Sequence, residues 1–166
     1  MPGSGKSTVG VILAKQSSRD FIDTDVLIQT GTGRTLQEIV DRDGYLTLRA
    51  LEEETLLSIR LTNHVIATGG SAVYSEAAMA HVKAHGTVVF LDTDLPTIRR
   101  RIRDFDTRGL AKSASQGLED LYRERLPLYQ KHADLTIVCG RSSQEEVCAR
   151  IVAELAAHPS LTGERP

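Results

Sequence analysis

The chain has 166 residues, 20 lysine and arginine residues against 22 aspartate and glutamate residues, and a formal charge of −2. This length indicates one domain, and a content of 40% hydrophobic and 25% charged residues is typical of a globular protein with one core. Balanced charge argues against a nucleic-acid-binding protein, and neither a membrane span nor a secretory signal is recognisable. We therefore expect a cytoplasmic monomer without nucleic-acid or membrane partners.

Short apolar runs alternate with longer amphipathic segments along the chain. Strands are predicted at 21–23, 64–68, 87–91 and 135–138, and helices at 6–16, 36–42, 45–62, 76–84, 95–105, 118–132 and 144–157. Continuous apolar strands are typical of a parallel sheet that is buried on both faces. The pattern predicts an α/β fold, a parallel sheet flanked by helices, in one domain over 1–157 with a flexible tail at 158–166.

A glycine-rich segment opens the chain and matches the second half of the phosphate-binding loop G-x-x-x-x-G-K-[ST]. Its residues are Gly3, Ser4, Gly5, Lys6, Ser7 and Thr8. The glycines let the backbone curl so that its N–H groups point at phosphate oxygens, and the helix that follows adds a positive field. Lys6 is expected to reach the β- and γ-phosphates, and the Ser7 hydroxyl to bind Mg²⁺. The alternative is a glycine-rich turn that only caps a helix.

The first glycine of this motif would stand one position before Met1, and the apolar strand that normally precedes the loop is missing from the sequence. Such a strand would lie centrally in a parallel sheet and make ladder hydrogen bonds on both sides. Either the chain as given starts downstream of the true start, or the sheet has only four strands. We favour the first explanation.

An acidic pair, Asp23 and Asp25, follows the predicted strand at 21–23, where α/β sheets bind their ligands. If the strand continues, its period of two puts both carboxylates on the same side. One would hold Mg²⁺ through water, and the other would accept a proton from an attacking hydroxyl. The alternative is that one of them caps the helix that follows.

Several further segments help to define element boundaries. Two helix starts carry a capping-box pattern, Thr35 with Glu38 and Ser142 with Glu145. The segment 106–117 has little periodicity and is predicted to be a mobile surface loop.

The two cysteines, Cys139 and Cys148, fit neither a zinc pattern nor a disulfide framework. We expect both to be small buried hydrophobic residues in a reducing compartment. The five histidines are scattered without metal-ligand spacing. Each is expected to be an ordinary solvated or capping side chain.

The order of the motifs resembles the shikimate kinase family from Met1 to about Ala157. The likeness is carried by the phosphate loop, Asp-Thr-Asp at 23–25, Gly-Arg-Thr-Leu-Gln-Glu-Ile at 33–39, Leu-Arg-Ala-Leu-Glu at 48–52, Val-Ile-Ala-Thr-Gly-Gly at 65–70, Val-Val-Phe-Leu at 88–91 and Arg-Leu-Pro-Leu-Tyr at 125–129. The resemblance implies a P-loop kinase of the nucleoside-monophosphate-kinase type, with a five-stranded parallel sheet, a lid at about 106–117 and a substrate-binding helical segment at about 25–62. It also implies ATP-dependent, Mg²⁺-assisted phosphorylation of the 3-hydroxyl of shikimate.

On the nucleotide side, the resemblance implies that Lys6 and Ser7 serve ATP and Mg²⁺, with Asp23 near the metal. Arg108 would close over the phosphates, and Arg101 is a weaker match to a residue that packs on adenine. An arginine on a loop is a usual way to neutralise charge on a transferring phosphoryl group, although Arg108 could also be one more loop cation.

On the acceptor side, the resemblance implies that Asp25 contacts the substrate hydroxyls and acts as the base. Arg49 and Arg125 would hold the substrate carboxylate, and Gly69 with Gly70 would line the pocket. Two arginines can form a planar bidentate clamp that lysine cannot imitate.

Each arginine also has a plainer interpretation. Arg49 could form only intrahelical pairs with Glu52 and Glu53, and Arg125 could be solvated on a charged helix face.

Three departures from the family pattern lie on the acceptor and lid side. Ser71 stands where a third glycine is usual, and its side chain is expected to add bulk and to resist a positive φ. Leu48 precedes Arg49 where phenylalanine is usual, and the lid reads Arg108-Gly109 instead of Arg-Pro. Two alternatives therefore stay open: a kinase for another small hydroxylated metabolite such as gluconate, and a non-catalytic nucleotide-binding module.

Overall fold

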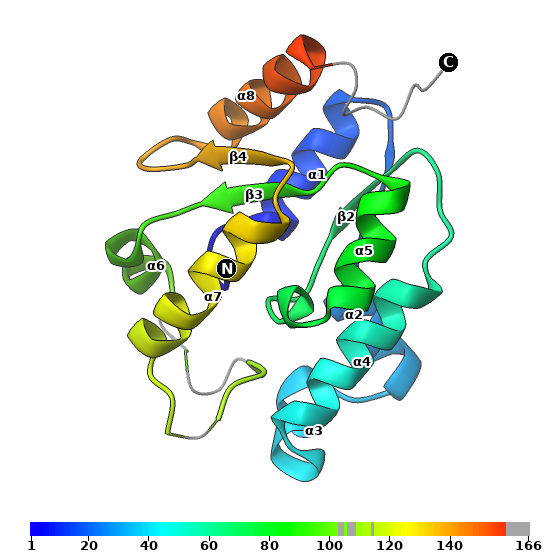
Figure 1. Cartoon of the computed structure of the whole chain (residues 1–166), viewed down its shortest axis with the longest axis vertical. Coiled ribbons are helices and arrows are strands. Elements are labelled where there is room, and N and C mark those ends of the chain that lie inside the picture. The colour runs from blue at the N-terminus through cyan, green and yellow to red at the C-terminus, as the bar shows by residue number, and fades with distance from the viewer. Residues whose placement is uncertain (103–104, 106–108, 114, 159–166) are drawn as a thin grey trace.

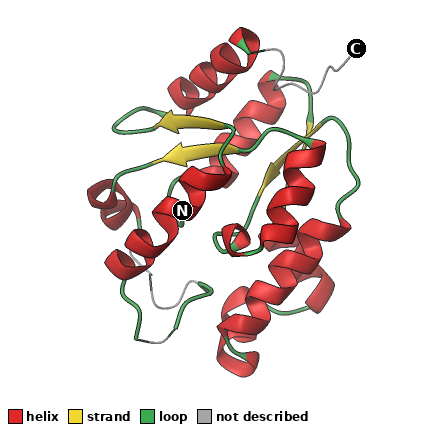
Figure 2. Ribbon diagram, viewed as in Figure 1, coloured by secondary structure: helices red, strands yellow, loops and turns green. Residues whose placement is uncertain are grey.

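The computed structural model describes residues 1–102, 105, 109–113 and 115–158. Its elements in chain order are α1 (Lys6–Gln16), β1 (Asp20–Asp23), α2 (Thr24–Thr32), α3 (Leu36–Asp43), α4 (Tyr45–Ser58), β2 (His64–Ala67), the 3₁₀ turn η1 (Ala72–Tyr74), α5 (Glu76–His85), β3 (Val89–Asp92), α6 (Leu95–Arg101), α7 (Leu118–His132), β4 (Leu135–Val138) and α8 (Gln144–Ala157). Helices flank short parallel strands (Figures 1 and 2), which confirms the α/β prediction.

The described strands form two separate parallel sheets of two strands each. β1 pairs with β2, with Phe21 opposite Val65, and β3 pairs with β4, with Phe90 opposite Thr136. The continuous sheet implied by the resemblance is therefore not formed, because β2 and β3 have no ladder between them. Helix α1 links the two pairs, since it contacts β1, β2 and α8. The strand expected before Met1 stays a prediction.

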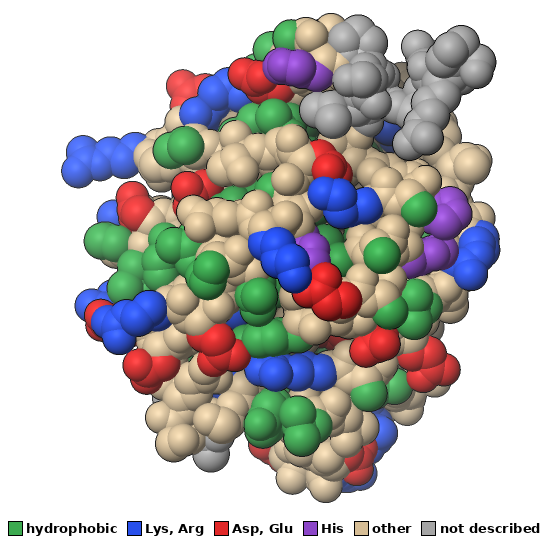
Figure 3. All heavy atoms as spheres, in the orientation of Figure 1, with side chains coloured by type: hydrophobic (Ala, Val, Ile, Leu, Met, Phe, Trp, Pro, Cys, Tyr) green, Lys and Arg blue, Asp and Glu red, His purple; other side chains and the backbone are tan. Residues whose placement is uncertain are grey.

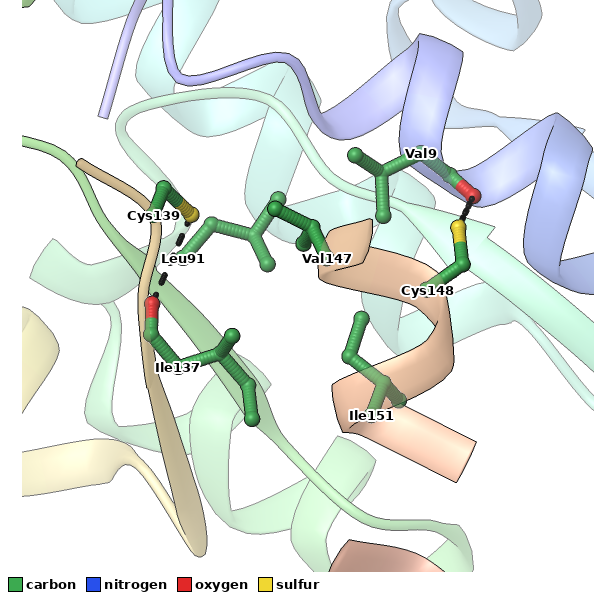
Figure 4. Close-up of a cluster of buried hydrophobic side chains, with 7 residues drawn as sticks. All are labelled: Val9, Leu91, Ile137, Cys139, Val147, Cys148 and Ile151. Atoms are coloured by element: carbon green, nitrogen blue, oxygen red, sulfur yellow. Dashed lines mark hydrogen bonds between the residues drawn. The ribbon is translucent and has the colours of Figure 1, made fainter. Parts of the chain in front are cut away.

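The core beside β3 and β4 is built from their side chains together with α1 and α8. Val9, Leu91 and Ile137 pack there with Cys139 and Cys148 (Figure 4). Both thiols are free and buried, as the sequence predicted. Helix α1 packs on β1 and β2 and also on α8. This packing holds the helix, and the glycine-rich segment before it, in place beside the strands.

The parallel pairing of β1 and β2 brings two chain segments to the same edge. Asp23 and Ala67 are register partners at the carboxyl ends of these strands. The segments that follow stay together, because the Gly69 N–H donates to Oγ1 of Thr24 at 2.9 Å. The acidic pair and the Gly69-Gly70 turn are thereby neighbours, although they are far apart in the sequence.

Predicted and observed boundaries differ at a few helix ends. Helix α4 ends at Ser58 rather than at 62, and α6 ends at Arg101 rather than at 105. The capping box on α3 is confirmed, but α8 is capped by Ser143 with Glu146 instead of Ser142 with Glu145. The reason is that the Ser142 N–H closes the turn after β4 by donating to the Cys139 carbonyl at 2.9 Å.

Charged side chains of both signs are interspersed over the face shown in Figure 3. This distribution agrees with the balanced composition. Among the helices that the structure describes, none combines the length and apolar character needed to cross a membrane.

Candidate active site

The glycine-rich segment forms a tight curl that ends in α1. Gly3 has φ 72° and Gly5 has φ 95°, and Gly5 is the N-cap of α1. Both backbone angles strongly favour glycine, and a Cβ added to Gly3 would lie 2.7 Å from Cγ1 of Ile102. The first N–H groups of α1, as at any helix start, have no acceptor within the helix. The predicted backbone curl is confirmed, and it offers donors to an anion.

Lys6 and Ser7 extend from this curl in different directions. The Lys6 side chain is half-buried, and its ammonium donates to the Met1 carbonyl at 3.0 Å. Burial lowers the pKa of Lys6, while the nearby carboxylates of Asp25 and Glu52 act in the opposite direction. The Ser7 hydroxyl donates to Oδ2 of Asp23 at 2.6 Å. The ammonium therefore lies near the carboxyl groups of Asp25 and Glu52, and the Ser7 hydroxyl lies beside the Asp23 carboxylate.

The acidic pair does not continue a strand, so the expected period-two arrangement is wrong. Strand β1 ends at Asp23, which caps α2 by accepting from the Asp25 N–H at 3.0 Å. Asp25 stands in the first turn of α2 and still reaches the same region as Lys6. The two carboxylates thus take separate positions, Asp23 beside Ser7 and Asp25 farther into the site.

A cavity of about 350 Å³ connects the phosphate loop with the predicted acceptor residues. Of the predicted site residues, its lining contains Gly3, Gly5, Lys6, Ser7, Thr8, Asp25, Gly70, Arg101 and Arg125. The lining does not include Ser4, whose hydroxyl is turned to the Met1 carbonyl at 2.9 Å. Asp23 and Gly69 border the lining residues, and Arg49 faces a second cavity of about 360 Å³.

Arg125 is buried at the inner wall of the site, with 1% of its surface exposed, so the solvated interpretation is wrong. Its Nη2 donates to the Ala111 carbonyl at 2.8 Å, and its Nε donates to the Tyr74 hydroxyl at 3.2 Å. A Cβ added to Gly70 would lie 2.9 Å from Nη1 of Arg125. The guanidinium therefore lies directly over the Gly70 backbone.

Arg49 approaches Arg125 from α4. Its guanidinium carbon lies 3.7 Å from the centre of the Tyr74 ring, and its Nη2 donates to the same Ala111 carbonyl at 3.4 Å. It forms an ion pair with Glu124 at 4.0 Å, rather than the intrahelical pair considered above. The Nε of Arg49 is buried and has no hydrogen-bond acceptor in the part of the chain that the structure describes. This charged donor is available for a bound anion.

Glu52 is a site residue that sequence reasoning missed. It lies one turn after Arg49 and is buried, and its Oε2 accepts from the Ser71 N–H at 3.0 Å and from the Ser71 hydroxyl. Burial raises the pKa of Glu52 to about 7, and the charge of Asp25 adds to this effect. The signal in the sequence was the segment Leu-Arg-Ala-Leu-Glu at 48–52, which contributed to the resemblance, but Glu52 itself was considered only as an intrahelical partner of Arg49.

The Gly69 turn brings the two carboxylates together. A Cβ added to Gly69 would lie 2.6 Å from Oε1 of Glu52 and 2.9 Å from Oδ1 of Asp25. Only glycine leaves room for both side chains at this position. Ser71 has φ −100°, so the expected resistance to a positive φ does not arise.

The predicted lid is described only in part, and Arg108 lies outside the described residues. Gly109 donates from its N–H to the Gln37 side chain at 2.6 Å, and Ala111 is buried. This portion packs on α3 rather than forming an exposed loop. Arg101 lines the cavity and donates to the Ser4 carbonyl at 3.3 Å, which brings it beside the phosphate loop.

Comparisons with known proteins give one consistent family. The sequence model described as shikimate kinase matches residues 2–156. The chain is 37% identical to a shikimate kinase of Paracidovorax citrulli over 100% of this chain and 92% of that protein, and 36% identical to shikimate kinase 2 of Enterobacter sp. over 92% and 90%.

Solved structures agree with the sequence relatives. The structure is similar to that of Acinetobacter baumannii shikimate kinase in complex with shikimate, with a TM-score of 0.84 and 30% identity over 94% of this chain and 89% of that one. It is also similar to the Aquifex aeolicus shikimate kinase, with a TM-score of 0.79 and 31% identity over 95% and 93%.

Proposed function

Because the chain belongs to the shikimate kinase family, we propose that it transfers the γ-phosphoryl group of ATP to the 3-hydroxyl of shikimate. This reaction belongs to aromatic amino-acid biosynthesis. The observation that carries the proposal is that Lys6, Asp25 and Arg125 line the same cavity. These residues supply a cation for phosphate, a base for an alcohol and a cation for a carboxylate. They match the three groups that must meet in this reaction.

The triphosphate of ATP binds in the curl formed by Gly3, Ser4, Gly5, Lys6, Ser7 and Thr8. Backbone N–H groups surround its oxygens, and the Lys6 ammonium contacts the β- and γ-phosphates. Arg101 packs beside the adenine, and Arg108 neutralises charge on the phosphoryl group from the lid at about 106–117.

Ser7 and Asp23 fit a magnesium ion. Their hydroxyl and carboxylate oxygens lie 2.6 Å apart at the start of α1. Oxygen ligands of this kind, completed by phosphates and water, are what Mg²⁺ prefers in phosphoryl-transfer sites. When bound there, the ion neutralises charge on the β- and γ-phosphates.

Asp25 acts as the general base. The shikimate 3-hydroxyl donates its proton to the Asp25 carboxylate as its oxygen forms a bond to the γ-phosphorus, and the bond from that phosphorus to the bridging oxygen of ADP breaks. The Lys6 side chain lines the same cavity as Asp25, so its ammonium is placed to offset negative charge on the phosphates during the transfer. Little covalent chemistry is needed, so position and charge dominate the rate.

Arg49 and Arg125 bind the carboxylate of shikimate, and the Gly69-Gly70 turn lines the pocket and leaves room for the side chains of Glu52, Asp25 and Arg125 around it. Both guanidinium groups donate to the Ala111 carbonyl, so they converge on one place although they come from α4 and α7. The helical segment at about 25–62 then serves as the substrate-binding part of the domain. The monomeric state and the cytoplasmic location stay predictions.

The test is turnover by the purified protein with Mg-ATP and a panel of hydroxy acids that contains shikimate and gluconate. ADP release measures the rate, and phosphorus NMR locates the new phosphate. We expect shikimate 3-phosphate as the product. Rapid turnover of another acid with none of shikimate would point to the alternative kinase, and ATP binding without turnover of any acid would point to the non-catalytic module.

A further inference from the structure

Tyr74 lies at the end of η1 and contacts both arginines of the proposed carboxylate site. We propose that Tyr74 is a positioning residue, which holds Arg49 and Arg125 as one preorganised pair for the substrate carboxylate. The inference rests on the proposed function, because it takes these arginines as the carboxylate ligands. It adds a residue that neither the sequence motifs nor the roles above assign.

The aromatic ring of Tyr74 positions Arg49. The guanidinium carbon lies 3.7 Å from the ring centre, which is within the range of a cation–π contact. The Tyr45 ring lies 5.2 Å from the same carbon, so Arg49 has aromatic neighbours from two elements. This stacking orients the planar guanidinium without using its N–H donors, and the buried Nε, which has no acceptor among the described residues, can donate to a carboxylate.

The hydroxyl group of Tyr74 positions Arg125. It accepts from Nε of Arg125 at 3.2 Å and donates to Oε1 of Glu124 at 2.5 Å. Burial and the hydrogen bond to Glu124 raise the pKa of Tyr74, so the phenol stays neutral and keeps its proton for that carboxylate. Arg125, Tyr74 and Glu124 therefore form one chain of hydrogen bonds.

The arrangement also addresses the repulsion between two like charges. Both guanidinium groups approach the Ala111 carbonyl, at 3.4 Å from Arg49 and 2.8 Å from Arg125. The electron-rich ring face and the Glu124 carboxylate offset this repulsion before a substrate arrives. Glu124 is half exposed and lies 4.0 Å from Arg49, so a substrate carboxylate has to compete with it only weakly.

Two variants separate the ring from the hydroxyl. Tyr74→Phe keeps the stacking surface and removes the contact to Arg125, and Tyr74→Leu removes both. We expect the KM for shikimate to rise about threefold in the first and about tenfold or more in the second. The KM for ATP should change less than about twofold in both. Tyr122→Phe, which removes the hydroxyl of a tyrosine on α7 outside these contacts, is the matched control.

The carboxamide analogue of shikimate supplies the second readout. The wild-type protein should prefer the acid to the amide, and Tyr74→Leu should reduce this preference by about tenfold. Equal losses with acid and amide, or an equal rise in the KM for ATP, would overturn the proposal, as would an unchanged KM in Tyr74→Phe and Tyr74→Leu. If Tyr74→Leu fails to fold, Tyr74→Phe alone decides. A wild-type protein that does not phosphorylate shikimate would instead refute the proposed function.

Discussion

The two halves of the proposed site are built in different ways. The nucleotide half is a continuous segment, residues 3–8, whose shape depends on two glycines with positive φ and on the start of α1. The acceptor half combines single side chains from α2, α4, η1 and α7 with one turn after β2. Its contacts join residues far apart in sequence, such as Arg49 with Ala111, which are separated by 62 positions.

This difference affects how each half tolerates change. Backbone donors on a short curl remain when a nearby side chain is replaced, because each residue contributes its N–H group. In the acceptor half, the contacts are made by side chains: Ser71 donates to the buried Glu52 carboxyl, and the buried Arg125 donates to the Ala111 carbonyl, so replacing one of these residues deprives a buried partner of a hydrogen bond. We therefore expect acceptor-side variants to alter catalysis and pH dependence while ATP binding persists.

The largest expected effect is that of Asp25→Asn. The amide cannot accept the proton of the attacking hydroxyl, so kcat should fall about 10²- to 10⁴-fold. ATP affinity, measured by calorimetry, should stay within about twofold, because Asp23 rather than Asp25 contacts Ser7. Equal losses of turnover and ATP affinity would show that Asp25 serves the metal or the fold. The nucleotide half and the acceptor half would then not be functionally separate.

Two glycine substitutions test directly whether the nucleotide half and the acceptor half act separately. Gly69→Ala would force a Cβ to within 2.6 Å of Oε1 of Glu52, so kcat/KM for shikimate should fall about tenfold to a hundredfold. Gly3→Ala, with φ 72° and a Cβ 2.7 Å from Ile102, should instead weaken ATP binding by about tenfold.

Gly31→Ala is the control for these substitutions, because it adds a methyl group in α2 where no atom lies within 4 Å. It should leave both KM values unchanged and slightly increase stability. If Gly69→Ala raised the KM for ATP as much as that for shikimate, the two halves would be one coupled unit.

Most of the fold followed from local patterns. The helices at 6–16, 118–132 and 144–157 and the strand at 135–138 were predicted with their observed ends, because amphipathic periodicity and apolar runs are local signals. Helix α2 was not given bounds of its own, since a helix after the acidic pair was only the alternative to a strand that continues through Asp25. The division into two sheets depends on pairing between distant strands, which no local pattern specifies.

The site residues also separate into those that a local motif specifies and those whose positions depend on contacts between distant segments. The curl of residues 3–8 was predicted because a motif of adjacent residues specifies its backbone. The positions of Arg49 and Arg125 were derived from resemblance, and the structure brings both to the Ala111 carbonyl. The Glu52–Ser71 contact could not be predicted, because it needs the packing of α4 against the turn after β2, and two residues 19 apart give no periodic signal.

The next expected effect concerns stability and pH. The pKa of Glu52 is raised to about 7, so its carboxyl binds a proton in the folded chain at pH values where the unfolded chain has lost it. The free energy of unfolding should therefore fall as pH rises from about 4.5 to about 7. Glu52→Gln cannot ionise, so it should be more stable than wild type by about 3 kcal/mol at pH 8 and equal to it below about pH 4.5.

Denaturant unfolding at several pH values measures this difference. The control is Glu54→Gln, an exposed residue on the same helix, whose effect should stay within about 0.5 kcal/mol at every pH. A constant difference between Glu52→Gln and wild type from pH 4.5 to pH 8 would contradict the buried, protonated carboxyl. It would also weaken the inference that a residue of the acceptor half determines how the free energy of unfolding changes with pH.

The smallest expected effect is that of Ser71→Ala, which removes the hydroxyl donor to Glu52 and keeps the N–H donor at 3.0 Å. Both bonds favour the ionised carboxyl, so losing one should raise the pKa of Glu52 further. The fall in stability should then move to higher pH, while the KM for shikimate changes less than about threefold. Ser58→Ala at the end of α4 should leave the profile unmoved, and an unmoved profile in Ser71→Ala as well would mean that the backbone alone positions Glu52.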